Sequence, residues 1–192
     1  MVVVIRFVFL NLARPRATGT RSENRSRHKH KRWAQAVKDR QVINDLEKHI
    51  TFDKPHIYWR FDDKLDVLNK IKVIDEAAAS LIWDRLNTGN FITDYALNKD
   101  RFDTFETIEF ADNYDSVTKR LKELAQTNDN IVLTWFSAQH TLLIDLKTFT
   151  DNWDDFFYPS SDDLVVIHKN WDWIIYIAHF ESFQIGQGIK TK

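Results

Sequence analysis

The sequence predicts an α+β fold in which a single antiparallel sheet has helices packed on one face. Three observations predict it. Apolar residues recur with helical spacing through the first half of the chain. Paired β-rich runs joined by short links fill the last third. Only 4 Gly and 3 Pro occur in 192 residues, which disfavours a loop-built scaffold. Helices followed by antiparallel strands are typical of a layered α+β domain.

Charge divides the chain into a basic leader and an acidic domain. Residues 1–40 contain 11 Lys or Arg and 2 Asp or Glu, a net charge of +9, whereas residues 41–192 contain 16 and 26, a net charge of −10. Residues 1–32 are dense in charge and poor in apolar residues after the first dozen, so we expect a disordered leader. An organelle transit peptide and an arm for nucleic acid or anionic membranes are the alternatives. Residues 33–192 then form a single acidic domain, large enough to bury about two-thirds of its unfolded surface.

Four helices are predicted in the first half of the domain. The third is the best defined, because Asp75 is a good N-cap and Gly89 is a good stop. After it, residues 102–110 alternate as a strand does. The other three predicted helices cover residues 33–49, 62–74 and 112–126.

Two hairpins are predicted in the last third. Residues 131–138 should pair with residues 140–146, and residues 163–168 with residues 171–178. The second hairpin is expected to turn at Lys169–Asn170, because Asn tolerates a positive φ. A short helix capped by Thr150 or Asp151 should separate the hairpins, followed by a loop at 158–163, and residues 183–186 are expected to add an edge strand.

Several classes of protein are excluded or disfavoured. The chain has no Cys, which excludes disulfides and thiolate metal sites. The longest apolar run, Val2–Leu10, is interrupted by Arg6 and falls short of the roughly 20 residues that span a bilayer. No Gly-rich phosphate-binding motif occurs. We therefore predict no membrane span, no metal and no cofactor.

One set of residues could carry catalysis. Asp129 precedes a predicted strand, and Asp145-Leu146-Lys147 ends the next one, with Glu123 on the helix before them. This arrangement resembles the signature of restriction-endonuclease-like nucleases, which implies two carboxylates on Mg²⁺ and a Lys that orients water or stabilises developing charge. The Pro that usually precedes the first acid is absent. The domain's net negative charge also disfavours a nucleic-acid partner. A metal-dependent nuclease is therefore an alternative. The strand residues His140, His168 and His179 are expected to be structural.

Acidic and aromatic residues alternate between positions 151 and 163. Aromatic rings anchor protein interfaces, and carboxylates steer a basic partner toward them. This segment is therefore the predicted partner-binding surface. The alternative is that Trp153, Phe156 and Phe157 pack the short helix on the sheet. The predicted contact residues are Asp151, Trp153, Asp154, Asp155, Tyr158, Asp162 and Asp163.

The order of elements from 134 to 186 also supports a binding protein. It consists of two strands, a short Trp-containing helix, an acidic loop and a Trp-rich closing hairpin, in TWFSAQHTLLIDL and NWDDFFYPSSDDLVVIHKNWDWIIYIAHFESFQIG. This layout resembles small bacterial proteins of immunity type, the cytoplasmic antidotes of polymorphic or contact-dependent toxins. The resemblance implies binding and inhibition, not catalysis. Because the domain is acidic and rich in aromatic residues, we expect it to occlude the active site of a basic toxin, such as a nuclease. It supplies no catalytic residue. A non-catalytic structural or housekeeping domain is the remaining alternative.

Overall fold

The computed structural model describes residues 39, 41–111, 113–125, 129–135 and 140–190. The chain divides into two units, Met1–Val37 and Lys38–Lys192, and all described residues belong to the second. The leader predicted for residues 1–32 lies outside the described residues and stays a prediction.

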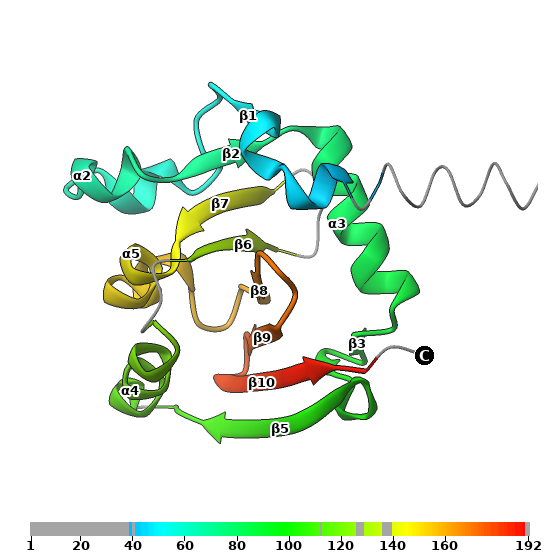
Figure 1. The fold of residues 1–192 in the computed structure, drawn as a ribbon. Helices are drawn as coiled ribbons and strands as arrows, with labels where there is room; N and C mark the ends of the chain where they lie inside the picture. Colours follow the sequence, from blue (N-terminus) through cyan, green and yellow to red (C-terminus); the bar gives the residue numbers. More distant parts are fainter. Residues whose placement is uncertain (1–38, 40, 112, 126–128, 136–139, 191–192) are drawn as a thin grey trace, which may run out of the picture. The chain divides into compact units, whose positions relative to one another are not determined.

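A single large antiparallel sheet forms the centre of the second unit (Figure 1). Its strand order is β1-β2-β7-β6-β8-β9-β10-β5, and β3 and β4 form a separate hairpin. The α+β class with one antiparallel sheet is therefore confirmed. The strands are β1 Ile50–Thr51, β2 Lys72–Ile74, β3 Ile92–Thr93, β4 Ala96–Leu97, β5 Phe102–Glu109, β6 Asn130–Thr134, β7 Thr141–Asp145, β8 Leu164–His168, β9 Trp173–Ala178 and β10 Ser182–Ile189.

Both predicted hairpins are present. In the first, Ile131 of β6 faces Ile144 of β7, and in the second, Val166 of β8 faces Ile175 of β9. The turn of the second hairpin differs from the prediction, because Trp171 and not Asn170 takes the positive φ, at 63°. The expected edge strand is also wrong, since β10 pairs with β9 on one side and with β5 on the other. The outermost strand at this side is β5, and most of its side chains are exposed.

Two predicted helices are confirmed, and each begins near a polar residue. The Asp75 carboxylate accepts a hydrogen bond from Ala78 N at 2.8 Å and caps α3, which ends at Gly89. The helix predicted over 112–126 is α4. The helices and 3₁₀ turns are η1 Leu46–His49, η2 Tyr58–Phe61, α2 Leu65–Leu68, α3 Glu76–Thr88, η3 Lys99–Arg101, α4 Tyr114–Leu124, α5 Leu146–Asp151 and α6 Trp153–Phe156.

The remaining helix predictions need correction. The helix predicted at 62–74 is shorter in the structure, where only α2 is helical. Lys72 pairs with Leu143 and begins strand β2. Of the helix predicted at 33–49, the described part gives helical residues at 39 and 41–44, then the 3₁₀ turn η1. The short helix before the acidic loop is split into α5 and α6. Asp145, not Thr150 or Asp151, caps α5, and its carboxylate accepts a hydrogen bond from Thr148 N at 2.8 Å.

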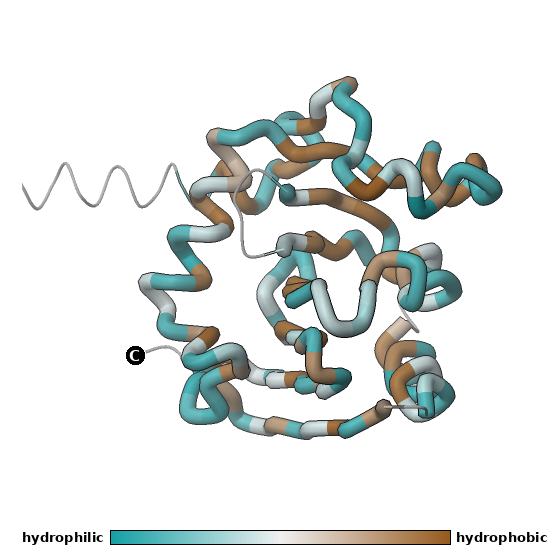
Figure 2. Tube along the Cα trace, turned by 180° about the vertical axis from the view of Figure 1, so that it is seen from behind, coloured by the Kyte–Doolittle hydropathy of each residue, from teal (hydrophilic) through white to brown (hydrophobic). Residues whose placement is uncertain are grey.

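The sheet has a hydrophobic core on each face. One core joins the strands to α2, α4, α5 and α6, and the other joins them to α3 and the β3–β4 hairpin. In Figure 1, α4 and α5 lie on one side of the strands and α3 on the other. Helices thus cover both faces, not one as predicted. The reason is visible in β8 and β9, in which every residue is buried, because central strands with two apolar faces need cover on both. Figure 2 shows hydrophobic residues along these central strands.

Among the described residues, no helix combines the length and apolar character that crossing a bilayer requires.

Candidate functional site

The residues of the nuclease hypothesis are each engaged in a different contact. The Asp145 carboxylate caps α5, and Lys147 forms an exposed ion pair with Asp151 one helical turn later. Asp129 lies 3.5 Å from His168 Nε2 and 3.6 Å from Lys169 Nζ. Within the described ranges, no group of three or more metal-binding side chains is found. The contacts of Asp145 and Lys147 are those of a helix cap and a surface ion pair.

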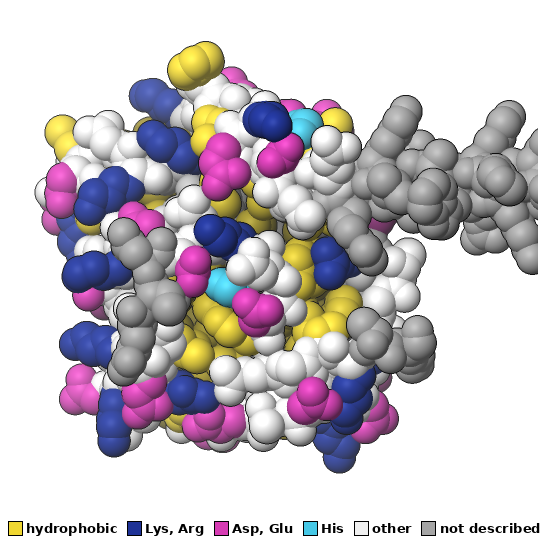
Figure 3. All heavy atoms as spheres, viewed as in Figure 1, with side chains coloured by type: hydrophobic (Ala, Val, Ile, Leu, Met, Phe, Trp, Pro, Cys, Tyr) yellow, Lys and Arg dark blue, Asp and Glu magenta, His cyan; other side chains and the backbone are white. Residues whose placement is uncertain are grey.

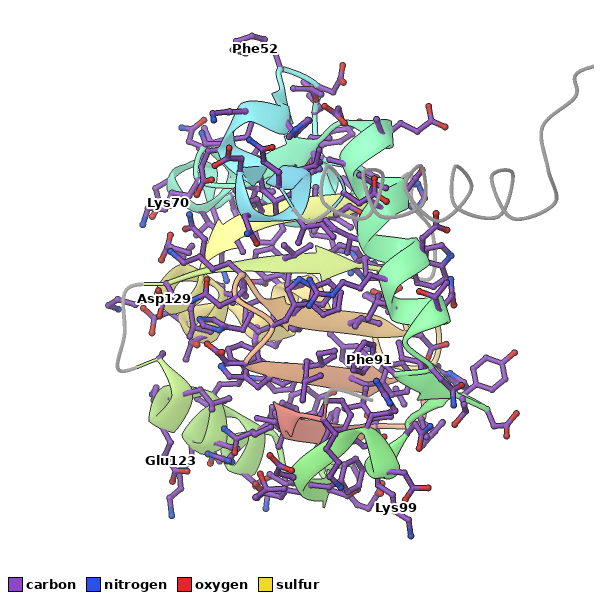
Figure 4. All side chains as sticks on the ribbon, turned by 45° about the vertical axis from the view of Figure 1, so that its right-hand side comes forward. Phe52, Lys70, Phe91, Lys99, Glu123 and Asp129 are labelled. Carbon is purple, nitrogen blue, oxygen red and sulfur yellow. The ribbon has the colours of Figure 1, made fainter. Side chains whose placement is uncertain are left out.

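Glu123, the additional acid of that hypothesis, lies on the surface of α4. It is paired with Arg120 of the same helix at 3.2 Å. Figure 4 shows Glu123 projecting outward from α4, away from Asp129. The structure therefore does not bring it toward the other two carboxylates.

Trp153 belongs to the hydrophobic core. Its side chain is 2% exposed and stacks on Tyr114, with 5.3 Å between ring centroids. The indole Nε1 donates a hydrogen bond to Thr118 Oγ1 at 2.8 Å. Phe156 and Phe157 are also buried. The prediction that Trp153 contacts a partner is therefore wrong, and the alternative, that these rings pack the short helix on the sheet, is confirmed.

Several acids of the predicted surface are matched by cations of the same chain. Asp155 forms an ion pair with Lys64 at 2.6 Å, and the hydrogen bond from Lys64 to Asp155 contributes most to raising the pKa of that Lys. Asp151 is paired with Lys147, whereas Asp154 is exposed. These pairs reduce the local charge that a partner would meet at α5 and α6.

The loop at 158–163 is fixed to η2 by an ion pair that is largely shielded from water. Arg60 and Asp162 lie 2.6 Å apart, and their side chains are only 12% and 13% exposed. Arg60 also donates a hydrogen bond to the Phe156 carbonyl at 3.2 Å and lies over the Tyr158 ring at 5.7 Å. The Asp162 carboxylate accepts a further hydrogen bond from Tyr158 N at 2.9 Å. Asp162 is therefore an anchor of the loop more than a contact for a partner.

The next residue, Asp163, ties the same loop to the turn between β9 and β10. Its Oδ1 accepts hydrogen bonds from the Tyr176 hydroxyl at 2.7 Å and from His179 N at 3.1 Å. His179 Nδ1 lies 3.0 Å from the same oxygen. Burial, and then the Asp163 carboxylate, raise the pKa of the Tyr176 hydroxyl, which keeps it a donor.

Three turns that are distant in sequence meet around His179. The Tyr95 ring, from the β3–β4 turn, lies edge-on to the His179 ring at 6.1 Å, and Phe180 lies edge-on at 5.2 Å. Ser160 N donates a hydrogen bond to the His179 carbonyl at 2.9 Å. Tyr95, Tyr158 and Phe180 are 60%, 58% and 53% exposed. We call this the three-turn surface, made of Asp94, Tyr95, Tyr158, Ser160, Asp163, His179, Phe180 and Glu181.

The three-turn surface is acidic. Its acidic residues are Asp94, Asp163 and Glu181, and residues 93–96, 158–163 and 179–182 contain no Lys or Arg. The cation that lies over Tyr158, Arg60, is already paired with Asp162. Exposed aromatic rings beside carboxylates therefore offer binding energy and attraction to a cationic partner in one place.

The backbone of the three-turn surface is unusual. Asp94, Tyr95, Ser160 and Glu181 all have positive φ, between 50° and 67°. This region is uncommon for residues other than Gly, and each such residue costs on the order of 1 kcal/mol. The turns are held by hydrogen bonds, among them Glu181 N to the Ala178 carbonyl at 2.8 Å. The exposed rings are thus presented from turns in fixed, strained conformations.

A second group of aromatic and titratable side chains lies around His56. Its ring stacks on His140 at 4.2 Å, and the Trp135 ring meets it edge-on at 4.7 Å. Burial, followed by the nearby His140 and Arg60, lowers the pKa of His56 to about 4. This His is therefore neutral at physiological pH, and it bears on stability at low pH.

The face shown in Figure 3 is hollowed over the central strands, with hydrophobic side chains visible among charged ones. A pocket of about 410 Å³ lies beside Lys169 and Leu143. Nearby, His168 is buried, stacks on Trp173 at 5.3 Å, and has the carboxylate of Asp172 2.8 Å from its Nδ1. Its place in the core supports the structural role predicted for it.

The three-turn surface is the best candidate for a functional site. Of the predicted contact residues, it contains Tyr158 and Asp163, with Asp162 anchoring the loop from behind. Sequence patterns missed Tyr95, His179 and Phe180 as contact residues, since nothing local connects turns so far apart. Their only signal was a large ring or a His in a short turn that lacks Gly. No protein-family model and no curated protein matches this chain.

Proposed function

We propose that this protein is a binding protein of immunity type that inhibits a basic toxin, with the three-turn surface as its contact. One observation carries the proposal. Three exposed aromatic rings lie in turns that also hold Asp94, Asp163 and Glu181 and that contain no Lys or Arg. Aromatic residues are enriched at the centres of protein interfaces, where a few of them supply most of the binding energy.

The charge of the domain supports a cationic partner. Residues 41–192 carry a net charge of −10, which accelerates association with a basic protein and disfavours anionic partners. Asp155 and Asp162 are paired with cations of the same chain, so they are not free to pair with the partner. The net negative charge of the domain would therefore act mainly on the association rate. The exposed rings would set the dissociation rate, and with it the lifetime of the complex. An antidote of this type acts in the cytoplasm, on a toxin that could itself be a nuclease.

The two alternatives have weaker support. The nuclease hypothesis needs Asp145 and Lys147 at a reaction centre, whereas their contacts are those of a helix cap and a surface ion pair. A structural or housekeeping domain would not need exposed rings on strained turns. Neither alternative accounts for the composition of the three-turn surface.

Co-expression with the product of the adjacent gene tests the proposal. Cells should survive that product only when this protein is present, and the two proteins should co-purify. Phe180→Ala and Tyr95→Ala should each raise the off-rate, weakening binding about tenfold or more, as expected for hot-spot rings. Phe52→Ala is the matched control, because Phe52 is fully exposed on a loop that Figure 4 shows at the far end of the fold. If the adjacent product is harmless, or if it kills cells that express this protein, the immunity proposal fails.

A further inference from the structure

The hydrogen bonds of His179 fix which of its ring nitrogens is left for a ligand. Nδ1 lies 3.0 Å and 3.1 Å from the two carboxylate oxygens of Asp163. That carboxylate also accepts hydrogen bonds from Tyr176 and from the His179 backbone. An ionised carboxylate only accepts hydrogen bonds, so the Nδ1 position carries the proton. In the neutral ring, Nε2 is then an acceptor, on a side chain that is 41% exposed.

The groups around His179 are those that attract a cation. The exposed rings of Tyr95 and Phe180 flank it, and aromatic faces bind ammonium and guanidinium groups. The carboxylates of Asp94 and Glu181 belong to the same turns as these rings. The Glu181 carboxylate accepts a hydrogen bond from Tyr114 of α4 at 3.4 Å.

We propose that Tyr95, His179 and Phe180 form a subsite for one Arg or Lys side chain of the partner. The cationic group would donate a hydrogen bond to His179 Nε2 and lie against the two rings, and Arg suits the site better because its planar group also stacks. The inference rests on the proposed function, in which the partner is basic. It adds which side chain is recognised and which residues recognise it.

The protonated nitrogen can be tested first, on the full chain without any ligand. Long-range ¹H–¹⁵N NMR spectra at pH 7.5 should show the His179 ring with a proton on Nδ1 and none on Nε2. A ring that carries its proton on Nε2 would present a donor to the partner and would overturn the proposal.

Peptide titrations test the subsite itself. The probes are acetyl-Gly-Arg-Gly-amide and the same peptide with citrulline, which keeps the shape of Arg but has no charge. The Arg peptide should shift the NMR signals of Tyr95, His179 and Phe180, and the citrulline peptide should bind at least about fivefold more weakly. Equal binding of the two peptides, or shifts that map elsewhere on the protein, would refute the subsite.

Variants complete the test. Phe180→Ala and His179→Ala should each weaken binding of the Arg peptide about fivefold. His49→Ala is the matched control and should have no effect, since His49 is also bonded to a carboxylate, that of Asp75 at 2.8 Å, but lies outside the three-turn surface. The wild-type comparison of Arg with citrulline needs no variant and decides the question even if His179→Ala is unstable.

The outcomes separate the two proposals. The peptide titrations involve no toxin, so their failure removes the subsite and leaves the proposed function to the protection assay. Failure of the protection assay with successful titrations would leave a cation-binding surface that serves another partner.

Discussion

Replacement of Asp162 by Ala should destabilise the fold, although the sequence predicted that Asp162 contacts a partner. The change removes the partner of Arg60 and leaves the guanidinium largely shielded from water, with its hydrogen bond to the Phe156 carbonyl. It also removes the acceptor for Tyr158 N. The change should therefore lower the free energy of unfolding, whether or not a partner is bound.

The size of the effect follows from the burial of the pair. Breaking a fully buried ion pair by removing one partner costs about 3–5 kcal/mol. Arg60 and Asp162 keep 12% and 13% of their side chains exposed, and Arg60 keeps a second acceptor, so we expect about 2–3 kcal/mol. For a domain of this size, that change lowers the melting temperature by roughly 5–10 °C.

A double-mutant cycle in urea measures the coupling. Asp162→Ala, Arg60→Met and the double variant are compared with the wild type, and the double variant should recover about 1–2 kcal/mol relative to the sum of the single changes. Asp154→Ala is the control, since Asp154 is an exposed acid in the same segment and its removal should be nearly neutral. If Asp162→Ala costs less than about 1 kcal/mol, the pair does not anchor the loop and the reasoning is wrong.

Two further predictions concern pH and the unused acid-x-Lys motif. The pKa of His56 is about 4 in the fold and about 6.5 when unfolded, so the unfolded chain binds the proton first and stability falls as the pH falls from 6.5 to 4. The full shift corresponds to about 3 kcal/mol, and partial exposure reduces it to about 1–2 kcal/mol. Urea unfolding should show this slope in the wild type but a flatter one in His56→Phe, and identical slopes would contradict the assignment. Asp145→Ala should cost about 1 kcal/mol through the lost cap of α5, whereas Lys147→Ala should leave stability unchanged. Cleavage of DNA or RNA with Mg²⁺ that is abolished by Lys147→Ala would instead favour the nuclease.

Local signals in the sequence predicted local structure well. The cap at Asp75 and the stop at Gly89 define α3, and the alternation in 102–110 defines β5. The prediction of a helix at 62–74 was wrong because the apolar residues of this segment pack into two different cores. Val67 and Ile71 face one core, while Ile74 in β2 faces the other. A helical spacing of apolar residues cannot reveal that the chain crosses from one face of the sheet to the other.

Global features could be inferred only in part. We predicted helices on one face of the sheet only. The continuous apolar sequence of β8 and β9 instead indicates that both faces of these strands are buried, and therefore that both faces of the sheet are covered. The role of Trp153 depended on Tyr114 in α4, a contact that no pattern near position 153 could indicate. The three-turn surface depended on the meeting of residues near 95, 160 and 180, which only the sheet order provides.

The strand order also has a consequence for synthesis of the chain. β5 neighbours only β10 in the sheet, and Glu109 faces Ser182 although they lie 73 positions apart in the sequence. The central strands β8 and β9 likewise follow most of the elements that pack on them. Domains of such non-local pairing fold slowly, and β5 has no strand partner until β10 has been synthesised. Until then, both edges of β5 are open, and a chaperone or another nascent chain can bind them.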